Sequence, residues 1–242
     1  MRPFVSAIIM RRILQGMDVN KQRSLGFRSA LTLLLGLGCA MAVARHHHAK
    51  PATGEPGQFD YYVLTLSWSP TYCLTHPQDH KQCSGKGYGF VLHGLWPQFD
   101  AGNWPEFCSN APLPPDARQL GSTLFPSPNL MEHEWQRHGT CSGLDAIAYF
   151  RTADQALGAV HVPKSLEAPG QTVSMTGAQI AAAFRTANPA IPADGVTVAC
   201  GRGELSEVRV CLTRNLTPRS CGAGVHSTCP TSPVEVPATR GQ

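Results

Sequence analysis

The stretch FDYYVLTLSW at residues 59–68 decides the fold, because its aromatic and β-branched residues with partial alternation predict a β-strand that Ser69-Pro70 ends. A second strand, GFVLHGLW, is expected at residues 89–96 and is stopped by Pro97. Well-alternating apolar residues predict two further strands at 195–200 and 207–213.

Helices are expected between these strands. One begins after Pro128 and ends at Gly139, a residue suited to a left-handed cap; a second follows the apolar stripe of 144–160. A third, Ala-rich helix is capped by Thr176 and runs to 187. The five prolines of 112–128 favour a loop with one helical turn. Strands and helices mix without βαβ alternation, so we expect a single α+β domain with a central, mainly antiparallel sheet and flanking helices.

Residues 1–44 are typical of a secretory signal peptide. Six basic residues and one acidic residue accompany an apolar run of about 15 residues that closes on Ala42-Val-Ala44. The run is shorter than the ~20 residues of a membrane span, although a buried helix or a retained anchor remains an alternative. The start at Met1 or Met17 stays open. We therefore expect a secreted or periplasmic protein with no membrane attachment after cleavage.

Removal of the signal changes both the charge and the cysteine count. The whole chain carries +4, but residues 45–242 hold 14 Lys and Arg against 15 Asp and Glu, a net charge of −1. Cys39 is lost, and an even set of eight cysteines in an exported chain predicts four disulfides. Spacing leaves all 105 pairings open. No two cysteines have the C-x2-C spacing of a metal site, so a metal cluster is not favoured.

The two ends of the mature chain have the composition of loops. Residues 45–58 combine a His triplet with Pro and Gly, which indicates an exposed, flexible tether. Residues 230–242 contain three prolines and few large apolar groups, which indicates a disordered tail. The folded domain is therefore expected at 59–229.

Two segments concentrate histidine, tryptophan and charge: FVLHGLWPQF at 90–99 and HEWQRHGTC at 133–141. On a helix, Glu134 and His138 share a face, with Arg137 beside them. The start of the second segment is similar to the zinc motif H-E-x-x-H, but Arg137 occupies the second ligand position and His138 arrives one residue later. A zinc hydrolase is therefore not favoured, and no metal or other cofactor is expected.

Two imidazoles that titrate near neutrality can take a proton from a nucleophile and give one to a leaving group. Guanidinium and further imidazole groups can stabilise a phosphate as it gains charge. RNA supplies its own nucleophile in the ribose 2′-OH, so these residues point to phosphodiester transfer on RNA.

Both segments resemble the two active-site signatures of the T2-type ribonuclease family and stand in the same order. LSWSPTYC at 66–73 also resembles the first strand of that family, and the resemblance spans 59–229. It implies an endoribonuclease that cleaves single-stranded RNA through a 2′,3′-cyclic phosphate to a 3′-phosphate. We expect the protein to be a monomer. A member of the family that binds RNA without cleaving it is the alternative, but such a protein would be expected to lack one of the key groups.

The resemblance also implies a role for each residue of the two segments. His93 matches the general acid and His138 the general base, while Glu134 and Arg137 match the pair that stabilises the phosphorane. His133 matches a phosphate-binding residue. Arg137 departs from the Lys of many members, and a fork-shaped cation is not equivalent to a point charge.

Base recognition is expected at Trp96, which matches a base-stacking position. Gln98 stands where some members carry an acidic residue that selects a base, so broad base specificity is expected. Trp135 is expected to be a core residue. The resemblance further implies the disulfide pairs Cys73 with Cys83, Cys108 with Cys141, Cys200 with Cys229 and Cys211 with Cys221.

Overall fold

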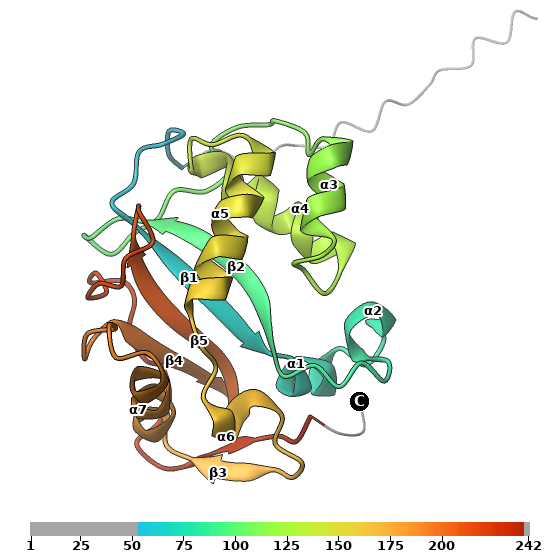
Figure 1. Cartoon of the computed structure of the whole chain (residues 1–242), viewed down its shortest axis with the longest axis vertical. Coiled ribbons are helices and arrows are strands. Elements are labelled where there is room, and N and C mark those ends of the chain that lie inside the picture. Colours follow the sequence, from blue (N-terminus) through green and yellow to red (C-terminus); the bar gives the residue numbers. More distant parts are fainter. Residues whose placement is uncertain (1–52, 240–242) are drawn as a thin grey trace, which may run out of the picture. The chain divides into compact units, whose positions relative to one another are not determined.

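A six-stranded, mainly antiparallel sheet organises residues 53–239, which are the residues that the computed structural model describes (Figure 1). Its strand order is β2-β1-β5-β6-β3, with β4 paired to β5 off this path. Along the chain the elements are β1 Tyr61–Trp68, α1 Ser69–Thr75, α2 His80–Cys83, β2 Phe90–Gln98, α3 Pro115–Gly121, α4 Pro128–Arg137, the 3-10 helix η1 Gly139–Cys141, α5 Ala146–Ala159, α6 Lys164–Glu167, β3 Val173–Met175, α7 Gly177–Ala187, β4 Val196–Gly201, β5 Glu204–Thr213 and β6 Val234–Val236.

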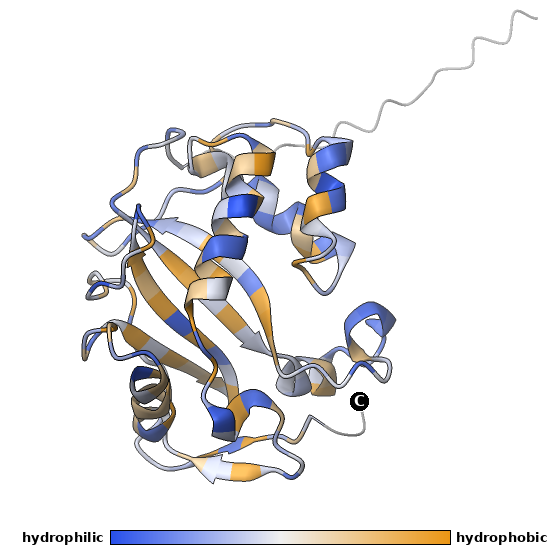
Figure 2. Cartoon of the chain, in the orientation of Figure 1, coloured by the Kyte–Doolittle hydropathy of each residue, from blue (hydrophilic) through white to orange (hydrophobic). Residues whose placement is uncertain are grey.

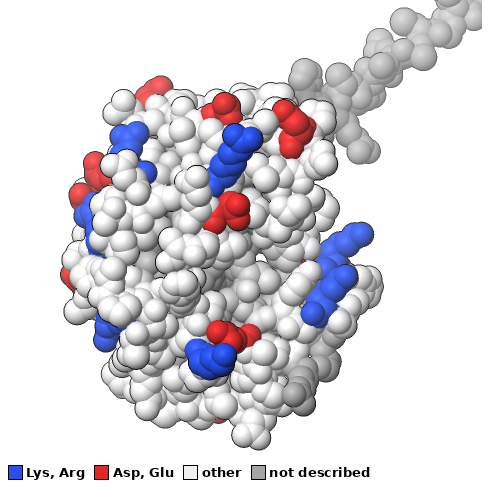
Figure 3. Space-filling model, viewed as in Figure 1, with Lys and Arg blue, Asp and Glu red and all other residues white. Residues whose placement is uncertain are grey.

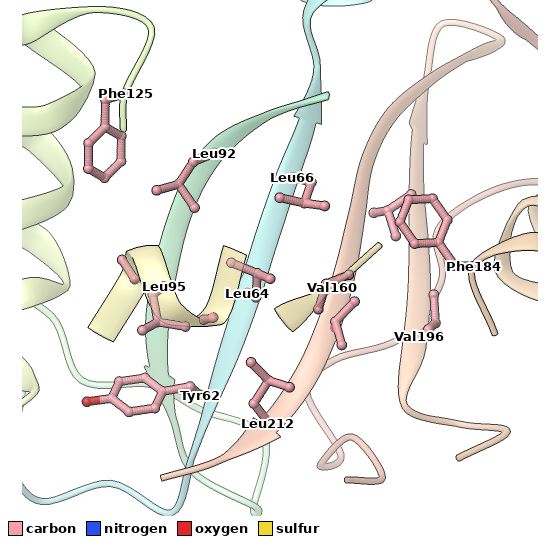
Figure 4. Packing of buried hydrophobic residues seen from close by; sticks show 14 of the residues in the cluster. Tyr62, Leu64, Leu66, Leu92, Leu95, Phe125, Val160, Phe184, Val196 and Leu212 are labelled. Atoms are coloured by element: carbon pink, nitrogen blue, oxygen red, sulfur yellow. The ribbon is translucent and has the colours of Figure 1, made fainter. Parts of the chain in front are cut away.

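The hydrophobic core lies between one face of this sheet and the helices that cover it. Alternate residues of β1, such as Leu64 and Leu66, point into it, as period-two geometry requires. Helix α5 lies across the same face and buries Tyr149 and Phe150 completely. Figure 4 shows Leu64 and Leu66 among other buried apolar side chains, and Figure 2 shows apolar residues along the strands. On the opposite face, a second and smaller cluster buries Tyr61 and Val63 of β1 and Cys211 of β5.

The α+β prediction is confirmed, and the four expected strands and three expected helices are present. Strand β2 passes through Pro97 to Gln98, because β2 is an edge strand and an edge tolerates a residue without an N–H group. Ser69-Pro70 begins helix α1, since proline suits the first turn of a helix. The single turn expected after Asp116 is a helix, α3.

The disordered tail predicted at 230–242 is wrong for residues 230–239. Strand β6 lies in this segment and pairs with β3, and Val236 is fully buried. The Trp68 indole N–H donates to the carbonyl of Pro237 at 3.1 Å. Two valines on one face of a short strand bury enough apolar surface to hold a segment whose composition favours a loop.

The flexible tether predicted at 45–58 is also wrong where the structure describes it. Thr53 N–H donates to the Glu106 carbonyl at 3.0 Å, and Gly57 N–H donates to the Cys141 carbonyl at 2.9 Å. These backbone hydrogen bonds hold residues 53–58 against the domain. The signal peptide predicted at 1–44 lies outside the described residues.

All four expected disulfides are present among residues 53–239. They join Cys73 to Cys83, Cys108 to Cys141, Cys200 to Cys229 and Cys211 to Cys221. The Cys108–Cys141 bridge ties the loop after β2 to the 3-10 helix that follows α4. It therefore links the two segments that carry the candidate site residues.

Candidate active site

His93 owes its position to a β-bulge in β2. Thr65 of β1 pairs with Gly94, and Leu66 pairs with Leu92, so His93 is the extra residue. A bulge shifts the alternation of a strand by one position and redirects a side chain. As a result, Leu92 and the later Leu95 both reach the core, while His93 lines a cavity on the other face.

Helix α4 supplies the second half of the site. It begins at Pro128, and Ser127 caps it by accepting a hydrogen bond from the Leu130 N–H at 3.4 Å. Its buried face carries Glu134 toward β2. The helix ends at Arg137, and His138 is the residue after it.

Gly139 does not form the left-handed cap predicted for it. It begins η1, and the φ angle of the capping residue His138 is −117°. Glycine is needed at 139 for space: a Cβ atom there would lie 2.5 Å from the Trp135 ring and 2.9 Å from the Tyr149 ring. Trp135 is buried in the core, as expected.

The buried carboxylate of Glu134 is held between two residues of β2. The Trp96 indole Nε1 donates to Oε2 at 2.7 Å, and His93 Nε2 lies 3.7 Å from Oε1. Burial raises the pKa of Glu134 to about 7, although the charge of His93 and the Trp96 hydrogen bond act in the opposite direction. A Cβ atom on Gly94 would lie 2.0 Å from Oε2, so this contact requires glycine there.

The pKa values of the two histidines are shifted in opposite directions. Burial by itself lowers the pKa of His93, but the hydrogen bond of Nδ1 to Glu207 at 2.6 Å and the charges of Glu134 and Glu207 outweigh it and raise the pKa. Burial, reinforced by the nearby charge of Arg137, lowers the pKa of His138 to about 2. Relative to a free imidazole, the surroundings therefore favour the protonated form of His93 and the neutral form of His138.

The Trp96 ring contacts both histidines. The Trp96 ring centroid lies 5.1 Å from that of His93 in an edge-on arrangement and 5.1 Å from that of His138 in a stacked one. Arg209 places its guanidinium carbon 5.6 Å from the same indole ring. The cavity has a volume of about 210 Å³.

All six predicted site residues line this cavity: His93, Trp96, His133, Glu134, Arg137 and His138. Arg137 is anchored by Glu106, because its Nε donates to Glu106 Oε1 at 2.6 Å. His133 is exposed at the rim. Among residues 53–239, no cluster of three or more His, Cys, Asp and Glu side chains could hold a metal ion.

The comparison with protein families gives a direct result. The model of the Ribonuclease T2 family matches residues 59–221. This chain belongs to the Ribonuclease T2 family. The resemblance noted in the sequence is thereby confirmed, and the matched range holds both halves of the cavity.

Two curated ribonucleases and one solved RNase-related protein are similar to this chain. A ribonuclease of Aeromonas hydrophila is 49% identical over 105 residues, which cover 43% of this chain and 48% of that protein. Ribonuclease DdI of Dictyostelium discoideum is 28% identical over 67% of this chain and 78% of its own length. The structure of an RNase-related protein from Calystegia sepium has a TM-score of 0.60 and 25% identity, and covers 75% of this chain and 98% of that one.

Four residues of this Ribonuclease T2 site were missed in the sequence. Glu207 and Arg209 come from β5, and Trp104 and Glu106 come from the loop after β2. A signal existed for the first two, because residues 207 and 209 share the face of a strand whose alternate residues 208 and 210 are apolar. Trp104 and Glu106 lie in a loop without periodicity, and only the fold brings them to the cavity.

Proposed function

We propose that this protein is an endoribonuclease that cleaves single-stranded RNA by acid–base catalysis with His93 and His138. The supporting observation is the opposite displacement of the two histidine pKa values within one cavity. A pair of titratable groups whose environments separate their pKa values is the arrangement that acid–base catalysis needs. The neutral imidazole can accept a proton and the protonated one can donate.

The first step is a transphosphorylation. The ribose 2′-oxygen attacks phosphorus while its proton passes to neutral His138. The bond from phosphorus to the 5′-oxygen breaks, and this oxygen takes a proton from His93. A 2′,3′-cyclic phosphate and a free 5′-hydroxyl result. His93 is left neutral, and His138 holds the proton that came from the 2′-hydroxyl.

The second step restores the protonation of the enzyme. A water molecule attacks the cyclic phosphate and gives its proton to His93, which is now neutral. The bond to the 2′-oxygen breaks, and this oxygen takes the proton held by His138. The product is a 3′-phosphate, and both histidines return to their starting states.

Charge on the phosphate is stabilised by local groups. Arg137 and Arg209 line the cavity, and His133 lies at its rim. Figure 3 shows basic and acidic side chains scattered over one face of the molecule without a continuous basic patch. RNA affinity therefore rests on a few cations in the cavity, and histidine protonation strengthens it as the pH falls. Binding a phosphate anion beside His138 would also raise its pKa and make it a stronger base.

The base binds to aromatic surface. Trp96 lines the cavity, as does Trp104, whose side chain is 44% exposed. An unpaired base can stack on such a ring and a paired base cannot, which supports a preference for single strands. Gln98 lines the same cavity and is buried; its neutral amide can both donate and accept, which supports broad base specificity.

The protein acts as a monomer outside the cytoplasm in this proposal. The eight cysteines of residues 53–239 form four disulfides, which persist in oxidising compartments. Within the same residues no helix has the length and apolar character to cross a membrane. Fractionation of cells that express the full chain, with gel filtration of the purified protein, checks compartment and oligomeric state.

One assay tests the proposal. The purified protein is incubated in excess EDTA with matched single-stranded RNA, double-stranded RNA and single-stranded DNA, and the products are identified by mass spectrometry. We expect cleavage of single-stranded RNA with cyclic phosphate ends that convert to 3′-phosphates. Activity that EDTA abolishes, equal cleavage of DNA, or RNA binding without cleavage would contradict the proposal.

Two substitutions locate the activity. His93→Ala and His138→Ala should each lower kcat by about 100-fold or more, because each removes one proton-transfer group. His161→Ala is the matched control, since His161 is exposed and lies outside the cavity. Equal activity of all three variants would exclude the assigned histidines.

A further inference from the structure

We propose that Glu207, held by Arg209, is a positioning residue for His93 that fixes which ring nitrogen faces the RNA. This inference rests on the proposed function, in which His93 is the general acid. It adds two residues of β5 to a site that the sequence motifs confine to β2 and α4.

The contact between Glu207 and His93 spans three strands. His93 belongs to β2 and Glu207 to β5, and β1 lies between these strands in the sheet. Glu207 is opposite Ser67 of β1, and the bulge that makes His93 the extra residue lies beside Leu66. Nδ1 of His93 lies 2.6 Å from Oε1 of Glu207, with side-chain exposures of 28% and 14%. The bulge thus brings the imidazole within hydrogen-bonding distance of a strand that β2 does not pair with.

Arg209 holds the carboxylate of Glu207 in one orientation. Its Nε and one terminal nitrogen donate to Oε2 at 3.0 and 2.6 Å. Two bonds from a planar fork to one oxygen leave Oε1 as the atom that faces His93. The guanidinium also lies over Trp96, so the Arg209 side chain is fixed on two sides.

This arrangement determines the direction of proton transfer. An ionised carboxylate only accepts hydrogen bonds, so Nδ1 carries a hydrogen and donates it to Glu207. The other nitrogen, Nε2, faces the cavity near Glu134 and is the atom that gives its proton to the leaving oxygen. A carboxylate that holds one nitrogen of a catalytic histidine selects the tautomer and stabilises the imidazolium.

The charge around His93 favours its protonated form. Glu207 and Arg209 approach it from β5, Glu134 from α4, and His138 from the end of that helix. Burial opposes the charge on the imidazole, and the two carboxylates outweigh burial and the cation of Arg209. The pKa of Glu207 is itself lowered, because its bonds to His93 and Arg209 outweigh its burial. These bonds therefore favour the ionised form of Glu207.

Glu207→Gln tests this role, because the amide keeps an oxygen acceptor for Nδ1–H but removes the charge. Glu235→Gln is the matched control: Glu235 is exposed on β6, outside both cavities that His93 lines. Two readouts are taken on each variant and on the wild type: the pKa of His93 by NMR titration without RNA, and the pH dependence of kcat and KM on a dinucleotide. Thermal unfolding checks that each variant folds.

We expect the pKa of His93 to fall in Glu207→Gln, because a negative charge beside the imidazolium is lost. A general acid is active below its pKa, so the alkaline limb of the kcat/KM profile should move to lower pH by the same interval. At neutral pH kcat should fall about 10-fold or more, with KM changed less than about threefold. Glu207→Ala, which also loses the acceptor, should be slower still.

The outcomes separate this inference from the proposed function. A wild-type protein that does not cleave RNA would contradict the proposed function, while the NMR titration still measures the Glu207–His93 contact. Cleavage by the wild type together with an unchanged His93 pKa and an unchanged alkaline limb in Glu207→Gln would overturn the inference. A variant that loses stability but keeps both pH readouts would show that Glu207 serves only as an ion-pair partner for Arg209.

Discussion

The indole Nε1 of Trp96 donates to Oε2 of Glu134 at 2.7 Å, which joins the edge strand β2 to helix α4 at the centre of the cavity. The edge of the ring therefore orients a buried carboxylate. The sequence motifs assign Trp96 only to stacking on a base. The structure adds a second role, and loss of the ring nitrogen affects the carboxylate directly.

Trp96→Phe should destabilise the fold and slow the reaction. The variant leaves Oε2 of Glu134 without its donor, and Oε1 already has no hydrogen bond among the residues that the structure describes. We expect a loss of about 1–3 kcal/mol in the free energy of unfolding and a further rise in the pKa of Glu134. Urea denaturation measures the first. Trp104→Phe, which removes a donor at an exposed site, should change stability by less than about 0.5 kcal/mol.

Glu134→Gln should remove one source of pH-dependent stability. The pKa of Glu134 is about 7 in the folded protein against 4.5 in the unfolded chain. The folded state thus binds the proton more tightly, and this contribution is full below pH 4.5 and is lost as the pH rises through 7. Relative to the wild type, the variant should gain on the order of 3 kcal/mol between pH 4 and pH 8. His138 contributes to the pH dependence of stability with the opposite sign, but it is present in both proteins and cancels in this comparison. A stability difference between variant and wild type that does not change with pH would contradict the raised pKa of Glu134.

Gly94→Ala should abolish activity through packing. A Cβ atom at this position would lie 2.0 Å from Oε2 of Glu134 and 2.4 Å from Nε1 of Trp96, so the hydrogen bond between them must move. We expect a loss of about 1–3 kcal/mol in stability and a large fall in kcat. Gly158→Ala in α5 is the control, because its Cβ atom would meet nothing within 4 Å; it should stabilise the protein by about 0.5–1 kcal/mol.

Removal of single disulfides should separate stability from activity. Loss of Cys108–Cys141, with a sequence separation of 33, should cost about 4 kcal/mol, and loss of Cys73–Cys83, with a separation of 10, about 3 kcal/mol. Only the first bridge ties the end of α4 to the loop that carries Glu106. Paired Cys→Ala variants, compared by denaturation and by RNA cleavage under folding conditions, should lose activity only when Cys108–Cys141 is absent.

Val236→Ala tests the order of the chain end. Val236 is fully buried in β6, so shortening its side chain should lower the free energy of unfolding by about 1–3 kcal/mol. Glu235→Ala on the exposed face of the same strand should cost less than about 0.5 kcal/mol. Similar stability of the two variants would indicate that residues 230–239 do not belong to the folded domain in solution.

Much of the site could be predicted because its residues lie close together in the chain. Helical spacing alone puts Glu134 and His138 near one another, and a short strand puts His93 near Trp96. His93, which the bulge redirects, belongs to the motif at 90–99, so the motif alone identifies it as a candidate site residue. The strands and helices followed from periodicity, which is a local property.

Contacts between distant strands could not be predicted in this way. Glu207 lies 114 residues from His93, and strand alternation marks it as a polar residue of β5 without indicating that its partner is His93. The burial of Val236 could not be predicted either. The prolines near it indicate disorder, and only the pairing of β6 with β3 places it in the sheet.

The sequence by itself determined the α+β class, the family and the two motifs of the site, because periodicity and motif spacing act over a few residues. Only the tertiary structure decided that His93 faces a carboxylate from β5, that Trp96 orients Glu134, and that residues 230–239 complete the sheet. Each of these depends on which strands and helices become neighbours and in what register strands pair, and that is settled by burial of apolar surface across the whole domain.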